Sequence, residues 1–202
     1  MKRILLITAL CLLQLCAGCG RQPSIGRLTG DSVILAFGDS LTEGSGAAPA
    51  ESYPARLAER TGFRVINAGV SGETTFEALR RFPAVLKKEK PDLIILCHGG
   101  NDMLRKFNPA TTEQNLRAMI SMAKESGADV ILIAVPKPGI ILKPAGVYKK
   151  LADEFRIPID EKSLSRILQN PAFKADTIHP NAAGYNRLAQ SVADLIQTSQ
   201  KQ

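Results

Sequence analysis

The stretch VILAFGDSLTEG, residues 33–44, joins a continuous apolar run to a glycine, a carboxylate and a hydroxyl. A short apolar run bounded by turn residues is typical of a buried strand, and Gly38, Asp39 and Ser40 would follow its end. These residue types are common in turns, so a simple turn is one interpretation. The other is that the turn presents Ser40 as a nucleophile, which the rest of the chain must support.

Further apolar runs share the length and flanking turn residues of the first. The predicted strands are Val33–Phe37, Phe63–Asn67, Leu93–Cys97 and Val130–Val135. Apolar residues at helical spacing predict helices at 53–60, 74–88, 111–127, 146–155 and 181–197. Continuous apolar strands that alternate with helices indicate βαβ units. We therefore expect an α/β fold, a three-layer α/β/α sandwich with a central parallel sheet.

The N-terminus is typical of an export signal. Two basic residues, an apolar stretch over 4–15 and two small residues precede Cys19. The sequence LCAGC, 15–19, resembles the bacterial lipobox, although Cys16 stands where leucine is usual. We expect a lipoprotein-type signal peptide at 1–18, a linker at 19–30 and one domain at 31–200. A lipidated Cys19 would anchor the exported protein to a membrane; a secreted or periplasmic soluble protein is the alternative.

Charge and cysteine content exclude some classes of function. The net charge is +7, but Lys and Arg are scattered and Trp is absent, so we expect no nucleic-acid partner. Cys97 is the one cysteine within the predicted domain, which leaves no disulfide there. It ends an apolar run, which favours a buried, inert thiol. A Cys97–His98 catalytic pair is disfavoured because neighbouring strand residues point to opposite faces, and we interpret His98 as structural.

Chemically capable residues follow the predicted strands, and a last group precedes the final helix. Ser40 follows the first strand, Gly72 lies in a glycine-rich turn after the second, and Asn101 follows the third. Asp176 and His179 lie just before the last helix. Because the crevice of an open α/β sheet lies outside the carboxyl ends of its strands, we expect these groups to meet there.

Serine catalysis accounts for these residue types. A serine hydroxyl needs a base within hydrogen-bond reach, and an imidazole titrates near neutrality, so His179 is the candidate base for Ser40. Asp176, three residues earlier, would orient His179. The oxyanion would need donors already aimed at it: the Gly72 N–H, the Asn101 amide and the Ser40 N–H. A glycine at 72 would let its N–H approach closely because no side chain is in the way.

Two further carboxylates in these stretches are interpreted as structural. We expect Asp39 to accept backbone N–H bonds around the nucleophile turn, and Asp102 to fix the turn after Asn101. The pair Asp176 and His179 has no cluster of other His or Cys residues nearby in the sequence, so a metal site is disfavoured.

Together the motifs resemble the blocks of the SGNH, or GDSL-type, hydrolases. GDSLTEG is similar to the serine block, NAGVSGET to the glycine block, GGND to the asparagine block and DTIHP to the aspartate–histidine block. The resemblance covers residues 38–180 and implies a flavodoxin-like fold and ester hydrolysis. It assigns the four namesake roles to Ser40, Gly72, Asn101 and His179, with Asp176 as third triad member. GGNDMLRKFNPATTEQNL further resembles the bacterial thioesterase I/lysophospholipase and arylesterase branch, whereas the segment 136–150 departs from it.

The sequence therefore predicts a serine esterase that needs no cofactor and no metal. Its substrates would be carboxylic esters or thioesters, with fatty acyl or aryl groups, cleaved through an acyl-serine intermediate. The apolar stretch at 139–147 favours acyl chains, although a core segment would look the same. The alternatives are a carbohydrate O-acetyl esterase and a non-catalytic surface lipoprotein that uses the fold as a binding module.

Overall fold

A single parallel sheet forms the centre of the molecule in the computed structural model, which describes residues 22–201. Its five strands lie in the order β2-β1-β3-β4-β5, and every pair is parallel. The strands are β1 Val33–Gly38, β2 Arg64–Gly69, β3 Leu93–Cys97, β4 Asp129–Ile133 and β5 Ile159–Asp160. The order reverses between β2 and β3, which both pair with β1. A crevice at the carboxyl end of β1 is expected from this topology.

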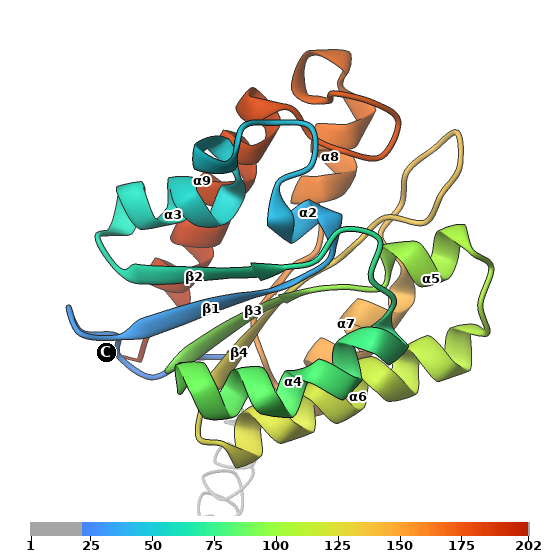
Figure 1. Ribbon diagram of the computed structural model, residues 1–202. Coiled ribbons are helices and arrows are strands. Elements are labelled where there is room, and N and C mark those ends of the chain that lie inside the picture. Colours follow the sequence, from blue (N-terminus) through green and yellow to red (C-terminus); the bar gives the residue numbers. More distant parts are fainter. Residues whose placement is uncertain (1–21, 202) are drawn as a thin grey trace, which may run out of the picture.

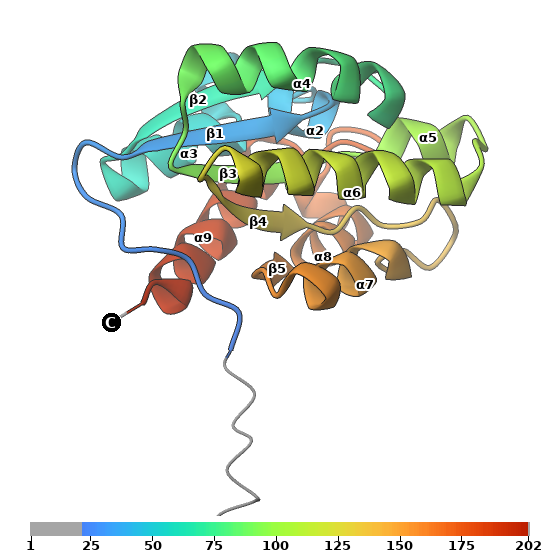
Figure 2. The ribbon, with the colours of Figure 1, turned by 90° about the horizontal axis from the view of Figure 1, so that it is seen from below.

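Helices cover both faces of the sheet (Figures 1 and 2). The α-helices are α2 Ser40–Glu43, α3 Tyr53–Thr61, α4 Thr75–Glu89, α5 Gly100–Leu104, α6 Pro109–Glu125, α7 Gly146–Phe155, α8 Ser163–Gln169 and α9 Ala182–Ser199. Two short 3-10 helices are η2 Pro49–Glu51 and η3 Pro171–Phe173. Helices α3 and α9 pack together on one face, and α4, α6 and α7 lie on the other (Figure 1). The three-layer α/β/α sandwich is confirmed.

The core lies between the sheet and these helices. Strands β3 and β4 are buried almost throughout, whereas β2, at the sheet edge, is half-buried. On the α4 face, Phe37 of β1 and Phe82 of α4 pack edge to face with ring centroids 4.6 Å apart. Buried aromatic pairs of this geometry stabilise the contact between layers.

Several elements were not predicted. Strand β5 has two residues, which is too short for a recognisable pattern. Helices α2, α5 and α8 are four, five and seven residues long and arise from turns and caps rather than from long amphipathic patterns. The predicted strands and the longer helices are present, and no boundary differs from its prediction by more than two residues.

The packed chain begins earlier than residue 31. Ile25 is fully buried, and its N–H donates to the Ser199 carbonyl at 2.8 Å. The Gly26 N–H donates to the Asp129 carboxylate at 2.6 Å. The part of the predicted linker from Ile25 onward is therefore held against the domain, because an apolar side chain and backbone donors find partners there. The predicted signal peptide and Cys19 lie outside the described residues.

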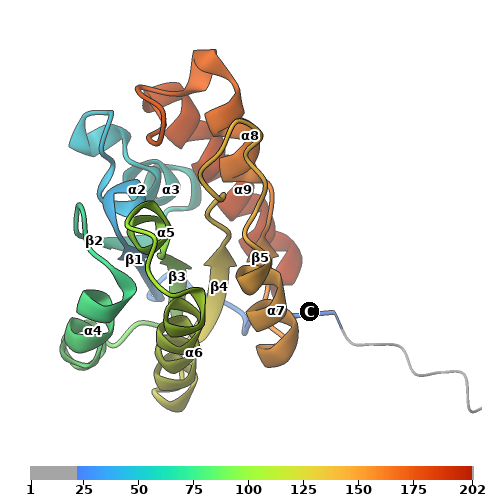
Figure 3. The same ribbon diagram turned by 90° about the vertical axis from the view of Figure 1, so that its right-hand side faces the viewer.

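Within residues 22–201, no helix has both the length and the apolar character that crossing a bilayer would require. Figure 3 looks at the side of the molecule on which α2 and α5 lie, beyond the carboxyl ends of β1 and β3. The loop after β4, residues 134–145, reaches the same side (Figure 3). The carboxyl edge of the sheet is thus covered by short helices and loops.

Candidate active site

The nucleophile turn is built by close packing at the end of β1. A Cβ atom on Gly38 would lie 2.2 Å from the Cys97 carbonyl oxygen, so β1 and β3 can approach here only with glycine. Asp39 then caps α2, accepting the Leu41 N–H at 3.0 Å with its carboxylate. Burial raises the pKa of Asp39, although nearby His98, the Leu41 N–H and His179 partly oppose the rise. Ser40 is the first residue of α2 and is almost completely buried.

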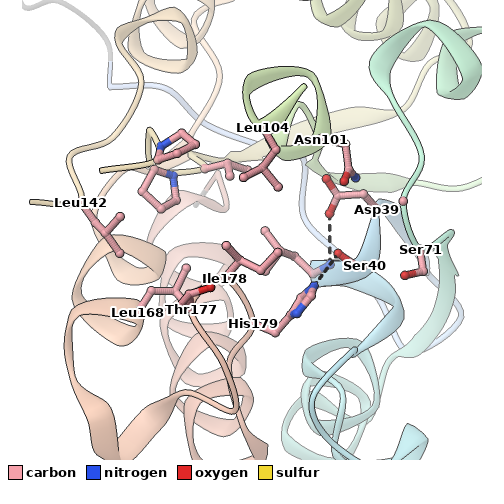
Figure 4. A pocket seen from close by; sticks show the side chains of 16 residues that line it. Asp39, Ser40, Ser71, Asn101, Leu104, Leu142, Leu168, Thr177, Ile178 and His179 are labelled. Carbon is pink, nitrogen blue, oxygen red and sulfur yellow. Dashed lines mark hydrogen bonds between the residues drawn. The ribbon is translucent and has the colours of Figure 1, made fainter. Parts of the chain in front are cut away.

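The loop before α9 brings an imidazole to this serine. The Nε2 atom of His179 lies 3.0 Å from Ser40 Oγ, and its Nδ1 atom lies 2.7 Å from an Asp176 carboxylate oxygen. The other oxygen of Asp176 accepts the N–H groups of Ile178 and His179, each at 2.8 Å. Burial would raise the pKa of Asp176, but the hydrogen bonds from the His179 ring and from these N–H groups hold it below its ordinary value. Ser40, His179 and Asp176 are therefore brought into one chain of hydrogen bonds. Figure 4 shows the His179 ring beside Ser40.

The two other candidate oxyanion donors line the same cavity. Gly72 has a φ of +75°, whereas a Cβ atom there would meet nothing closer than Arg105 Nη2 at 4.0 Å. The positive φ, not a lack of space, therefore favours glycine at this position, which differs from the reason expected from the sequence. Asn101 donates from Nδ2 to the Glu73 carbonyl at 2.9 Å. An amide nitrogen carries two hydrogens, so the second can serve a ligand.

The Asp102 carboxylate bonds to other helices, whereas the sequence led us to expect that it fixes the turn after Asn101. Its carboxylate accepts the Thr75 hydroxyl at 2.5 Å and the Thr75 N–H at 2.9 Å. It is also 3.3 Å from the Thr112 hydroxyl. Asp102 therefore joins α5 to the beginning of α4 and to α6, rather than fixing only its own turn.

A cavity of about 220 Å³ opens beside Ser40 (Figure 4). Asp39, Ser40, Gly72, Asn101 and His179 form its polar end. Its apolar wall comes from separate elements, namely Leu104, Val135, Pro136, Pro138, Leu142, Leu168 and Ile178. A mostly apolar pocket with a few polar groups at one end suits a ligand with an apolar body and one reacting polar group.

The sequence identified only part of this wall. Leu142 belongs to the apolar stretch at 139–147 singled out before, but Ile140 and Ile141 in the same stretch are exposed and do not line the cavity. Leu104 and Leu168 lie in α5 and α8, which were not predicted, so no sequence signal connected them to the site. Glu73 was also missed, and its only signal is that it directly follows Gly72.

Among residues 22–201, no group of three or more His, Cys, Asp or Glu side chains is arranged to hold a metal ion. Cys97 is buried, and burial raises the pKa of its thiol well above the ordinary value. Its neighbour His98 is also fully buried and lies outside the chain of hydrogen bonds that includes Ser40.

A parallel sheet with a serine, an imidazole and amide donors at its carboxyl edge defines the class of SGNH-type serine hydrolases. The chain belongs to this class: the model of the GDSL-like lipase/acylhydrolase family matches residues 36–187. It is a serine ester hydrolase.

Individual relatives lie within the same class. The chain is 31% identical over 179 residues to thioesterase 1/protease 1/lysophospholipase L1 of Escherichia coli K12, covering 85% of this chain and 86% of the relative. It is 32% identical over 171 residues to an arylesterase of Vibrio mimicus, covering 79% and 86%. The crystal structure of TesA superposes with a TM-score of 0.75 at 30% identity, covering 83% of this chain and 99% of that one.

Two more distant relatives bear on the alternatives. An acetylxylan esterase of Geobacillus stearothermophilus is 25% identical over 198 residues, covering 78% of this chain and 90% of the relative. An uncharacterized lipoprotein of Bacillus subtilis, YqeF, is 32% identical over 114 residues, covering 50% and 46%.

Proposed function

We propose that the protein hydrolyses esters or thioesters of apolar carboxylic acids, with Ser40 as nucleophile. The observation that carries this is the hydrogen-bonded chain from Ser40 Oγ through His179 to Asp176 beside a mostly apolar cavity. Likeness to a thioesterase/lysophospholipase and an arylesterase supports the same substrate class.

The reaction follows from the geometry in two steps. Ser40 Oγ attacks the carbonyl carbon while its proton moves to His179 Nε2, 3.0 Å away. The oxyanion accepts hydrogen bonds from the Ser40 N–H, the Gly72 N–H and the Asn101 amide. Its collapse expels the alcohol or thiol, which takes the proton from His179. Water then attacks the acyl-serine and gives a proton to His179. The bond between the acyl carbon and Ser40 Oγ breaks, Ser40 Oγ takes the proton back from His179, and the acid leaves. Asp176 holds the Nδ1–H tautomer and offsets the charge of the imidazolium.

The apolar wall favours an acyl chain over an acetyl group on a sugar. Pro138 lines both the cavity beside Ser40 and a second hollow of about 740 Å³, which is walled in part by Met103, Phe107 and Val147. A chain longer than the first cavity therefore has an apolar surface to follow. Each buried methylene contributes about 0.8 kcal/mol, which corresponds to about a fourfold gain in kcat/KM per methylene.

The test is hydrolysis of p-nitrophenyl esters by the wild type and by Ser40→Ala and His179→Ala. We expect both substitutions to lower kcat by about 10⁴-fold or more, since each removes a member of the triad. Ser126→Ala, at the end of α6 and far from the cavity, is the matched control and should leave kcat unchanged. Equal rates for wild type and Ser40→Ala would leave the non-catalytic binding module as the function.

Chain length separates the two ester classes. We expect kcat/KM to rise from acetate to octanoate with the wild type. A monotonic fall over the same series would favour the O-acetyl esterase, to which the acetylxylan esterase likeness points.

We also propose that the chain is exported and lipidated at Cys19, on the evidence of the sequence around 15–19 and of the lipoprotein relative. Five residues separate Cys19 from Ile25, where the packed chain begins, and the six steps from Cys19 to Ile25 can span about 20 Å at most. The anchor would thus keep the domain close to the membrane. Cys19→Ala should move the mature protein from the membrane to the soluble fraction; an unchanged distribution would refute lipidation.

A further inference from the structure

The Glu73 side chain is buried behind the cavity, directly after Gly72, and is 7% exposed. Its carboxylate accepts two hydrogen bonds from the Arg81 guanidinium, from Nε at 2.6 Å and from Nη2 at 2.7 Å. His98 Nε2 lies 3.1 Å from the same carboxylate. A buried, fully coordinated carboxylate of this kind has a fixed position, because both oxygens are held from different elements.

The His98 ring has a defined proton position in this arrangement. Its Nδ1 atom accepts the Gly99 N–H at 3.0 Å, so the ring hydrogen lies on Nε2 and points to Glu73. The His98 carbonyl in turn accepts the Tyr148 hydroxyl at 2.8 Å. The carboxylate of Glu73 is therefore held by Arg81 from one side and by the His98 ring from another.

Arg81 also holds the ends of two strands. Its Nη2 atom donates to the Ala68 carbonyl of β2 at 2.9 Å and lies 3.3 Å from the Gly38 carbonyl of β1. Its guanidinium stacks on the Phe37 ring at 4.1 Å from the centroid. Gly38 lies two residues before Ser40, so one side chain connects the nucleophile turn with Glu73.

The backbone of Glu73 reaches the candidate oxyanion donors. Its carbonyl accepts the Asn101 Nδ2–H at 2.9 Å, and its N-terminal neighbour is Gly72. Whatever fixes residue 73 therefore fixes the peptide next to Gly72 and the orientation of the Asn101 amide. Oxyanion donors are effective only when they are aimed before the reaction, and small displacements cost large factors in rate.

We propose that Glu73, clamped by Arg81 and His98, is a positioning residue that holds the Gly72 and Asn101 donors in register with Ser40. The inference rests on the proposed function of those three residues. Stability alone does not account for the network, because a buried ion pair is often no more stabilising than apolar side chains of the same volume. What it supplies is a fixed geometry between β1, β2 and the two loops that carry the donors.

A double-mutant cycle tests this with Glu73→Gln, Asn101→Ala and the double variant. Glutamine keeps the shape but loses the charge that Arg81 and His98 hold. We expect Glu73→Gln to lower kcat by about 10- to 100-fold with KM changed by less than about threefold, because the donors act mainly in the transition state. In the Asn101→Ala background, the factor by which Glu73→Gln lowers kcat should be at least about threefold smaller, because the Asn101 amide that Glu73 positions is already absent.

A role limited to folding gives a different result. Glu73→Gln would then lower the melting temperature and the fraction of active enzyme, but kcat per active site would stay unchanged. Any remaining effect of Glu73→Gln on kcat would multiply independently with that of Asn101→Ala. Active sites are counted by the burst of p-nitrophenol, so misfolded protein does not enter kcat. Glu154→Gln is the matched control, because it removes an ion pair with Arg117 on α6 and α7 away from the cavity; its kcat should stay within about twofold of wild type.

A readout without turnover separates this proposal from the proposed function. The side-chain amide of Asn101, assigned by its loss in Asn101→Ala, should shift in the ¹⁵N–¹H spectrum of Glu73→Gln and not in that of Glu154→Gln. An unmoved Asn101 amide, or strictly multiplicative kcat effects in an active enzyme, overturns the positioning role. If Glu73→Gln does not fold, Arg81→Lys enters the same cycle, because one ammonium cannot hold Glu73, Ala68 and Gly38 together.

Discussion

The two sides of the proposed catalytic cleft are built in opposite ways. On the oxyanion side, Glu73, His98 and Asp102 are buried and bonded across several elements. On the base side, the Asp176 side chain is 53% exposed and the His179 side chain 18%. There the contacts are local: Asp176 bonds within its own loop, and the Ala175 N–H donates to the His179 carbonyl at 2.9 Å.

This difference in burial agrees with the proposed chemical role of each side. Oxyanion donors gain their effect from being immobile and shielded from water, which only a buried framework provides. A base must exchange protons with leaving group and water in turn, so partial exposure is compatible with its task. The comparison predicts that removing a donor held by the buried side lowers kcat more than removing the exposed Asp176 carboxylate, because water can partly replace that carboxylate.

Thiol labelling should show the largest contrast between the two sides. Cys97 ends β3 beside His98, and burial raises the pKa of its thiol, so it reacts only after the core opens. A cysteine placed at exposed Thr177 reports on the base side. We expect Cys97 to be alkylated at least about 10³-fold more slowly than Thr177→Cys, measured by mass spectrometry of the labelled peptides. Comparable rates would mean that the buried side opens as readily as the loop.

Of the two groups that assist Ser40 and His179, the Asn101 amide should cost more kcat on removal than the Asp176 carboxylate. Losing one oxyanion donor lowers kcat by about 10²- to 10³-fold, so Asn101→Ala should fall in this range with little change in KM. Steady-state hydrolysis of a p-nitrophenyl ester measures it. Asn108→Ala is the control, because that amide caps α6 and does not line the cavity. If both variants lose activity equally, Asn101 is not a special donor.

Asp176→Ala should cost less than Asn101→Ala. An exposed charge pair at about 4 Å in water is worth about 1 kcal/mol or slightly more, and water can take the place of the carboxylate at His179 Nδ1. We expect a loss of about tenfold in kcat, compared under the same assay. If Asp176→Ala lowers kcat more than Asn101→Ala does, solvent does not replace the exposed carboxylate and the comparison between the two sides is wrong.

The sequence predicted the base side and the nucleophile more completely than the oxyanion framework. Ser40, Asp176 and His179 lie in short motifs at the ends of recognisable elements, and the parallel sheet brings these ends together. A continuous apolar run predicts a buried strand, and alternation with helices predicts parallel strands whose carboxyl ends lie at one edge of the sheet. Local pattern was sufficient because each motif sits at an element boundary.

The framework could not be predicted in the same way. Glu73 lies in a loop and Arg81 in α4, eight residues apart, and their meeting depends on how α4 packs on Phe37. Helical periodicity identifies the apolar face of α4 but does not say which arginine turns inward, Arg80 or Arg81. The wall of the cavity depends on α5 and α8, whose short lengths give no periodic signal.

The smallest effect concerns the acid stability of the buried side. Burial alone would raise the pKa of Glu73, but hydrogen bonds from His98 and Arg81 and the charge of Arg81 hold it below its ordinary value of 4.5. A carboxylate whose pKa is lowered by folding stabilises the protein fully above its unfolded pKa and loses this contribution as pH falls through the folded value. Glu73→Gln cannot titrate, so the gap in unfolding free energy between wild type and variant should narrow below about pH 4.5. Urea unfolding at several pH values measures the gap. If the difference in unfolding free energy stays constant down to the pH of acid unfolding, Glu73 is not held as an anion in the folded protein.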